Sequence, residues 1–295
     1  MMNGWTRELL TRAGFEAENL RAIEAAEARL SADEDWRSFL ETDPCGGAES
    51  GEALMERMRP MAERAHLPAE SAYLCCQIAG LPVLAGRYLE KGWTEELLLG
   101  AARDLHSKMT ECLEVDGVCG TQDHSFAFEL GLFRLTLIVL GRLQYEQRVY
   151  PGPDCELPGG VTVRAGDRIY GMHIPSGAPL DREACRASYQ KAYEFFGCTK
   201  ERPLIVHCAS WLLNPDHRWM LPESSRIIGF MNDFTPIRTS RQERFTAAWR
   251  IYGHASKLPM EQWPEDNALR RGYLRLLREG RPIQTGEGLL LYRGE

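Results

Sequence analysis

The stretch LIVLGRLQYEQRVY, residues 137–150, marks the point where the chain changes from helical to strand-like sequence. It is rich in β-branched and aromatic residues, which favour strands. From position 143 onward, Leu143, Tyr145, Gln147 and Val149 fall on one face, and charged and amide side chains fall on the other. Such period-two alternation predicts a strand with one buried face.

The sequence before this stretch predicts helices almost throughout. Residues 18–30 are rich in Ala and Glu, which favour helix. From Leu97 to Leu113 an apolar residue recurs every four positions, as on one side of a helix, and Thr94 stands where an N-cap is expected. Glycine and proline separate the helical segments. We therefore expect an all-helical N-terminal domain over residues 1–134.

The sequence after this stretch predicts alternating strands and helices. Residues 161–164 and 168–174 are expected strands, joined by a hairpin turn at 165–167. A loop then leads to a helix that Asp181 can cap and that Gly197 can end. The later expected elements are a buried strand at 204–213, a helix with Pro222 in its first turn, a strand through Phe245, Ala247, Trp249 and Ile251, a helix at 267–279 and a strand at 283–292.

These patterns predict the fold class α+β, with the helical N-terminal domain followed by a mixed α/β domain over residues 135–295. The chain has 295 residues, 44% of them hydrophobic and 26% charged, with a net charge of -7. An acidic protein without a block of Lys and Arg is expected to have no nucleic-acid partner.

No signal peptide and no apolar run of membrane-spanning length is evident, so we expect a cytoplasmic protein with no membrane partner. The nine cysteines include no CxxC pair, so we expect small core residues and no metal site.

The second half contains four motifs whose order is typical of one protein family: GRLQYE at 141–146, MHIPSGAPL at 172–180, CASWLL at 208–213 and LPESSRIIGF at 221–230. Together they resemble a bacterial acyltransferase-like family whose members pair a helical N-terminal domain with a GNAT-like C-terminal domain. The resemblance implies an acyl-CoA co-substrate, acetyl-CoA or longer. It also implies N-acyl transfer to an amine of a small molecule or peptide. The acyl group, the acceptor and the oligomeric state stay open.

The resemblance also places the coenzyme A site. A GNAT site holds acyl-CoA between two parallel strands that part, and the following loop cradles the pyrophosphate on backbone amides at a helix start. That comparison assigns Met172 and Ile174 to the first strand and Ser176, Gly177 and Ala178 to the phosphate loop.

This loop departs from the common Arg/Gln-x-x-Gly-x-Gly/Ala pattern. Pro179 removes an amide donor, and Asp181 and Glu183 place negative charge where a pyrophosphate would lie.

Acyl transfer needs a route to deprotonate the amine and a proton for the leaving thiolate. Glu146, on the polar face of its strand, is the candidate base, and an ordinary solvated carboxylate is the alternative. His173 is expected near the thioester, with a structural hydrogen bond as its alternative role. Cys208 and Ser210 share one face of the partner strand, where either would protonate the thiolate or simply pack. Trp211 is expected in the core.

Two other classes of function stay open. A thiol enzyme would form an acyl intermediate on Cys208; its neighbour His207 points to the other face, whereas His173 is expected to reach it from the adjacent strand. A non-catalytic binding or scaffold protein on a degenerate GNAT fold would account for the altered phosphate loop.

Overall fold

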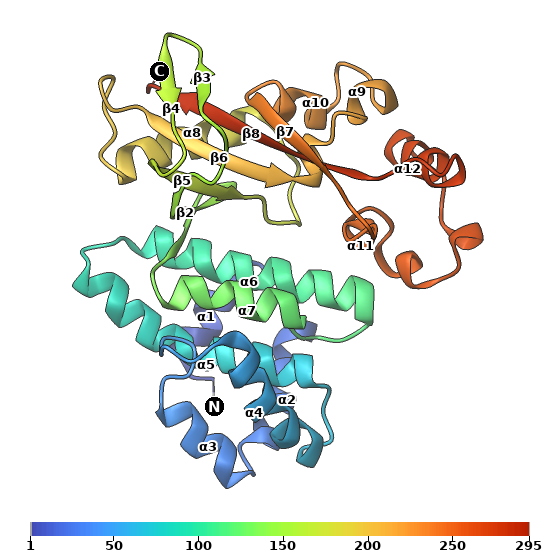
Figure 1. The fold of residues 1–295 in the computed structure, drawn as a ribbon. Coiled ribbons are helices and arrows are strands. Elements are labelled where there is room, and N and C mark those ends of the chain that lie inside the picture. The colour runs from blue at the N-terminus through green and yellow to red at the C-terminus, as the bar shows by residue number, and fades with distance from the viewer. Residues whose placement is uncertain (1, 295) are drawn as a thin grey trace. The chain divides into compact units, whose positions relative to one another are not determined.

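The computed structural model describes residues 2–294 and divides the chain into two compact units, one ending at Val139 and one beginning at Leu140 (Figure 1). The sequence placed the domain boundary five residues earlier, after residue 134.

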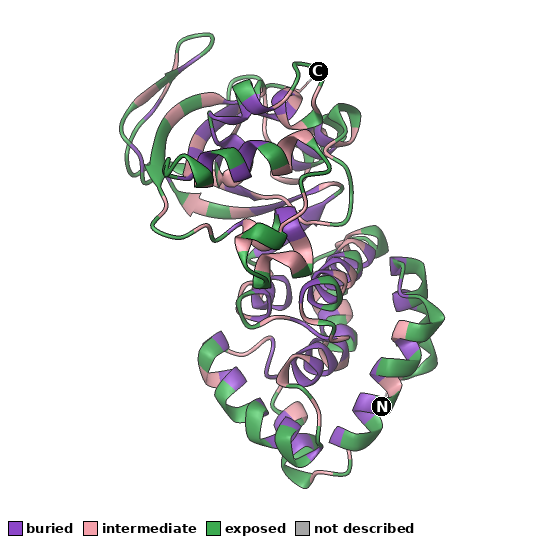
Figure 2. Ribbon diagram, turned by 90° about the vertical axis from the view of Figure 1, so that its right-hand side faces the viewer, coloured by how far each residue is buried: buried purple, intermediate pink, exposed green. Residues whose placement is uncertain are grey.

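The first unit is helical, as expected. Its helices are α1 (Gly4–Ala13), α2 (Ala17–Leu30), α3 (Glu34–Glu41), α4 (Gly51–Arg64), α5 (Ala69–Glu90), α6 (Glu95–Asp116) and α7 (Asp123–Phe133). Residues 71–78 of α5 are all buried, and they include Cys75 and Cys76, which form part of the core. Burial is concentrated on the inward sides of the surrounding helices (Figure 2). Thr94 occupies the N-cap position of α6, although its side chain makes no capping hydrogen bond.

The second unit is a mixed α/β domain. Its strands are β1 (Leu137–Leu140), which crosses the division between the units, β2 (Leu143–Val149), β3 (Cys155–Leu157), β4 (Val161–Val163), β5 (Arg168–His173), β6 (Leu204–Ser210), β7 (Thr235–Arg241) and β8 (Gln284–Tyr292). Its helices are α8 (Arg182–Phe195), α9 (His217–Met220), α10 (Arg226–Met231), α11 (Ala248–Tyr252) and α12 (Ala268–Arg278), with short 3-10 turns at Trp211–Leu213, Gly253–Lys257 and Met260–Gln262.

The main sheet has the strand order β1-β2-β5-β6-β8-β7, while β3 and β4 form a separate two-stranded sheet. The pairs β2–β5, β6–β8 and β7–β8 are antiparallel, and β5–β6 is parallel. Helix α8, which follows β5, packs on one face of this sheet: the Tyr145 and Ser188 hydroxyls are 3.1 Å apart, and Tyr170 stacks on Phe196. The register then assigns every strand residue to the α8 face or to the opposite face.

Several expected elements take a different form. Residues 137–150 form two strands, because Gly141 adopts a left-handed φ of 79° and turns the chain between them. The expected hairpin of residues 161–174 is wrong: β4 pairs with β3, and β5 pairs with β2. The turn at 164–167 exists, closed by the Asp167 amide donating to the Arg164 carbonyl, but it leads from one sheet to the other.

Three later expectations are also wrong. The alternating stretch around Trp249 forms helix α11 instead of a strand, because its aromatic neighbours pack into a cluster with Tyr273 of α12 and with Trp263, which precedes that helix: Phe245 stacks on Tyr273 and Tyr252 packs on Trp263. Pro222 precedes helix α10, which begins at Arg226 with the Ser225 side chain as its cap. The strand expected to run to Leu213 ends at Ser210 and continues as a 3-10 turn.

Within residues 2–294, no single helix has both the length and the apolar composition to cross a membrane. Helices α4 and α5 meet those two criteria only as a pair, and that pair is bent by 113°.

Candidate active site

The centre of the sheet contains a parallel strand pair that stays in register for only two positions. Strands β5 and β6 pair at Tyr170 with Val206 and at Gly171 with His207, and no further pair joins their described residues. Beyond this point β5 continues through Met172 to His173, paired only with β2, while β6 runs on to Ser210, paired only with β8. The strands therefore part at Gly171, as the resemblance required of a site that holds acyl-CoA between strands.

The loop after β5 is held by one side chain that the sequence analysis did not single out. Arg142 donates three hydrogen bonds to the loop carbonyls, to Pro175 at 2.8 Å, Ala178 at 2.7 Å and Pro179 at 3.0 Å. All its guanidinium nitrogens thus bind one side of the loop. Gly177 lies between these carbonyls with a φ of 86°, a conformation that favours glycine.

The remaining residues assigned to coenzyme A lie along the same path. Met172 is buried in β5, and Ile174 is half-buried directly after the strand ends. Ser176 is half-buried, whereas Gly177 and Ala178 are exposed at the tip of the loop. The structure thus brings these five residues together as one strand end and loop.

One of the two acidic residues at the start of α8 has an ion-pair partner. Asp181 occupies the N-cap position but makes no capping hydrogen bond, so its expected role as a cap is wrong. Its carboxylate instead pairs with Arg226, 2.7 Å away. One of the two negative charges that argued against a pyrophosphate here is therefore already balanced.

Glu146 and His173 meet on the sheet face opposite α8. Glu146 pairs with Gly171 and Gln144 with His173, so the two side chains are diagonal neighbours on antiparallel strands. Glu146 Oε1 lies 3.2 Å from His173 Nε2, and each side chain is about one-third exposed (35% and 33%). The neighbouring His173 imidazole lowers the pKa of Glu146, and this effect outweighs the opposing effect of burial. Two residues that the sequence analysis named separately thus form one exposed carboxylate–imidazole pair.

Cys208 lies on the other face. Cys208 is two residues after Val206, so both side chains lie on the face that α8 covers, where Val206 pairs with Tyr170. His173 lies on the opposite face, together with His207. The expected contact between His173 and Cys208 is therefore wrong. The Cys208 thiol is fully buried, and burial raises its pKa to about 12, so no thiolate forms at neutral pH. This geometry argues against the thiol enzyme.

Ser210 has a local structural partner. Its hydroxyl accepts a hydrogen bond from the Leu212 amide, 3.2 Å away, and caps the 3-10 turn at Trp211–Leu213. Trp211 is half-buried, beside His217. The apolar run of CASWLL predicted a strand through residue 213, and only the structure shows that the strand ends at Ser210.

A second imidazole–carboxylate pair extends the polar face, and the sequence analysis missed it. His207 Nε2 lies 3.2 Å from Glu287 Oε2, and the Arg238 guanidinium donates to the other oxygen at 2.9 Å. Burial lowers the pKa of His207 despite this carboxylate. Burial also raises the pKa of Glu287, but the hydrogen bonds from Arg238 and His207 outweigh it and the net pKa is lowered. These partners come from β6, β7 and β8, so no local motif joins them.

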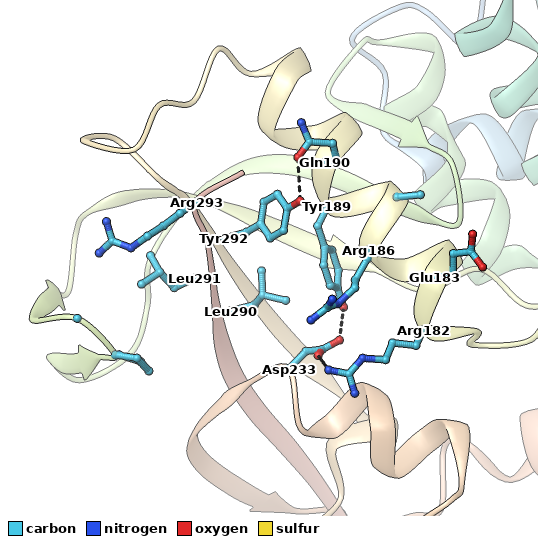
Figure 3. Close-up of a pocket in the computed structure, with 13 residues that line it drawn as sticks. Arg182, Glu183, Arg186, Tyr189, Gln190, Asp233, Leu290, Leu291, Tyr292 and Arg293 are labelled. Atoms are coloured by element: carbon cyan, nitrogen blue, oxygen red, sulfur yellow. Dashed lines mark hydrogen bonds and ion pairs between the residues drawn. The ribbon is translucent and has the colours of Figure 1, made fainter. Parts of the chain in front are cut away.

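A cavity of about 970 Å³ lies beside the first half of α8 (Figure 3). Arg182 and Arg186 extend from α8 toward Asp233, which accepts a hydrogen bond from the Tyr189 hydroxyl, 3.1 Å away. Arg293 lines the cavity from the other side, after the end of β8. The lining contains three arginines and two carboxylates, and Arg182 lies 4.0 Å from Asp233, so the excess of positive charge suits an anion.

Among the described residues, no group of three or more His, Cys, Asp or Glu side chains is arranged to hold a metal ion.

Comparisons with known proteins agree with this architecture. Residues 137–290 match the family described as GNAT-like C-terminal domain, and residues 6–125 match the N-acyltransferase N-terminal domain. No curated protein matches the chain in sequence.

Solved structures share the fold over nearly the whole chain. An acyltransferase mutant in complex with octanoyl-CoA is 21% identical, with a TM-score of 0.72 over 99% of this chain and 89% of that chain. An acyltransferase in complex with decanoyl-CoA and teicoplanin is 20% identical, with the same TM-score and coverage. Together with the family matches, these likenesses show that the chain belongs to the family of proteins that carry a GNAT-like C-terminal domain, here behind an N-acyltransferase N-terminal domain.

Proposed function

We propose that this protein is an acyl-CoA-dependent N-acyltransferase that acts on an amine of a small molecule or peptide. The observation that carries the proposal is the parting of β5 and β6 at Gly171, followed directly by the loop that Arg142 holds at the start of α8. Parted parallel strands expose backbone groups that bind an extended pantetheine chain, and the loop offers amides to a phosphate.

The nucleotide end of the co-substrate has a fitting site nearby. The cavity beside α8 contains Arg182 and Arg186 on the first two turns of this helix, so phosphates bound at the loop would have further cations within reach. Arginine recognises phosphate through paired N–H donors, which a solvated lysine does less well.

Transfer then takes place on the face that bears Glu146. The amine nitrogen attacks the thioester carbonyl carbon, a C–N bond forms and the C–S bond breaks. Glu146, which is ionised at neutral pH, accepts the proton that the amine loses. Glu146 then gives up this proton, directly or through water, to the departing CoA thiolate, so the step balances and the carboxylate is regenerated. Cys208 has no part in this scheme, since it lies on the opposite face.

The acyl group is proposed to be a medium-length chain. Two similar structures were solved with octanoyl-CoA and decanoyl-CoA. If the chain is fully buried, each methylene contributes about 0.8 kcal/mol, so decanoyl-CoA should bind roughly tenfold more tightly than octanoyl-CoA.

The test is a thermal-shift titration of the full chain with CoA, acetyl-CoA, octanoyl-CoA and decanoyl-CoA. A ligand that binds only the folded protein at about 100 times its Kd stabilises it by about 2.7 kcal/mol, which raises the melting temperature. We expect the shift to grow with chain length. A melting temperature indifferent to all four compounds at millimolar concentration would remove the transferase and favour a binding or scaffold role.

A further inference from the structure

Arg148 carries a guanidinium for which the protein itself offers no partner. It lies on β2, two residues after Glu146, and it is half-buried. Its Nε atom is buried and has no hydrogen-bond partner among residues 2–294. Buried donors are nearly always paired in folded proteins, so an unpaired one needs a reason.

Gly171 explains how this side chain reaches the site. A Cβ atom at Gly171 would lie 2.7 Å from Arg148 Cδ and 2.9 Å from Glu146 Oε1. Both side chains therefore lie against the backbone of β5 at the residue where β5 parts from β6. A larger residue at this position would have to displace both side chains from the backbone.

The neighbouring groups leave the charge of Arg148 available. The nearby His207 imidazole is buried and its pKa is lowered, in part by Arg148 itself, so it is neutral at pH 7. The carboxylate of Glu287 is already bound by His207 and Arg238. The carboxylate of Glu146 is in contact with His173, and the interaction between Arg148 and Glu146 is a Coulombic attraction without a hydrogen bond.

We infer that Arg148 binds an anionic group of the acceptor, so that the acceptor is an amine with a carboxylate a few bonds away, as in an amino acid. This inference rests on the proposed function. The Cα atoms of residues two apart on one strand are separated by about 7 Å, and both side chains lie against the backbone of Gly171. One small acceptor can therefore place its amine at Glu146 and its carboxylate at Arg148. The planar guanidinium fork matches a carboxylate with two parallel hydrogen bonds.

The experiment compares matched acceptors with decanoyl-CoA as donor, following CoA thiol release. Four free acids, such as phenylalanine and glycylphenylalanine, are each paired with their C-terminal amides, and kcat/KM is expressed per concentration of free amine. We expect the acids to be preferred by about 10- to 100-fold, the effect of one charge-assisted contact. In Arg148→Gln the preference should fall toward one, mainly through KM, and Arg148→Lys should retain part of it.

The control is Arg168→Gln, which removes an exposed arginine from the first position of β5 and should keep the preference intact. Equal kcat/KM for acids and amides in the wild type would overturn the inference, as would equal losses for both in Arg148→Gln. Acyl-CoA binding without transfer to any of the acids would overturn it while leaving coenzyme A binding in place. Failure of the proposed function itself would be distinguished by a melting temperature that no acyl-CoA changes.

Discussion

At the scale of single residues, the central feature is the contact between Glu146 and His173. Taken alone, each residue could have a purely structural role in its strand. The antiparallel register of β2 and β5 places them 3.2 Å apart, and the imidazole lowers the pKa of Glu146. Glu146 is therefore a weak base that accepts the proton once the attack on the thioester has made the amine nitrogen acidic.

The pH dependence of acyl transfer tests this pair. The pKa of Glu146 is lowered in the folded protein. The carboxylate therefore stays ionised, and keeps its stabilising contact with His173, at every pH above this lowered value, and it loses both as the pH falls through that value. His173→Ala removes the largest cause of this lowering, so the acidic limb of the kcat/KM profile should move to higher pH.

Glu146→Gln should lower kcat by about 10²–10⁴-fold, the usual effect of losing a general base. If His173→Ala abolished the acidic limb and reduced kcat as severely as Glu146→Gln does, His173 would be the base instead. An unchanged kcat in Glu146→Gln would exclude Glu146 from the chemistry.

At the scale of elements, the loop of residues 175–179 depends on a residue more than thirty positions away. Two prolines and a left-handed glycine restrict its backbone, and the three hydrogen bonds from Arg142 bind its carbonyls. Carbonyls occupied by a cation leave the amide side of a loop free for an anion. This arrangement answers the concern that the loop lacks the common phosphate-binding pattern.

Arg142→Ala should therefore weaken acyl-CoA binding more than it slows transfer. Hydrogen bonds to a charged group contribute about 1.5–3 kcal/mol each when buried, and these are partly exposed, so we expect KM for acyl-CoA to rise at least about tenfold. Arg142→Lys should recover little, because an ammonium cannot match three carbonyls in the geometry of the guanidinium. Arg164→Ala, which removes an exposed arginine from the turn before β5, is the control. Equal KM in all three variants would show that the loop is not part of the binding site.

At the scale of the whole molecule, the helical unit contains a buried acidic pair that makes stability depend on pH. Glu129 in α7 is fully buried, and burial together with the neighbouring Asp104 carboxylate raises its pKa well above the usual range. The nearby Lys108 is bound to Glu111, 3.3 Å away. The folded protein thus holds a proton that the unfolded chain releases.

Stability should fall as the pH rises from the usual glutamate range toward the raised value, by up to about 1.4 kcal/mol per pH unit. Glu129→Gln keeps the shape of the protonated acid and should flatten this slope. Melting temperatures from pH 5 to 8 check it, with Glu56→Gln, an exposed position in α4, as the control. If the melting temperatures of the wild type and of Glu129→Gln changed equally with pH, Glu129 would not be protonated in the folded protein.

Much of the fold was predictable because strong local patterns specify single elements. The four-residue apolar recurrence of α6, the capped α12 and the strand β8 form where expected, and the order of motifs correctly indicated the family. Local patterns failed where packing outweighed them, as at α11, where an alternating stretch formed a helix within an aromatic cluster that includes Tyr273 of α12.

The candidate site also has one part that the sequence predicted and one part that it did not. The sequence by itself determined which residue types lie at the end of β5 and in the loop after it, because these follow one another along the chain. Only the tertiary structure decided that His173 meets Glu146, that Cys208 lies on the opposite face, and that Arg142 and Arg148 reach the loop and the parting strands. The physical reason is register: a shift of one residue between strands reverses every face, and register is set by packing across the sheet.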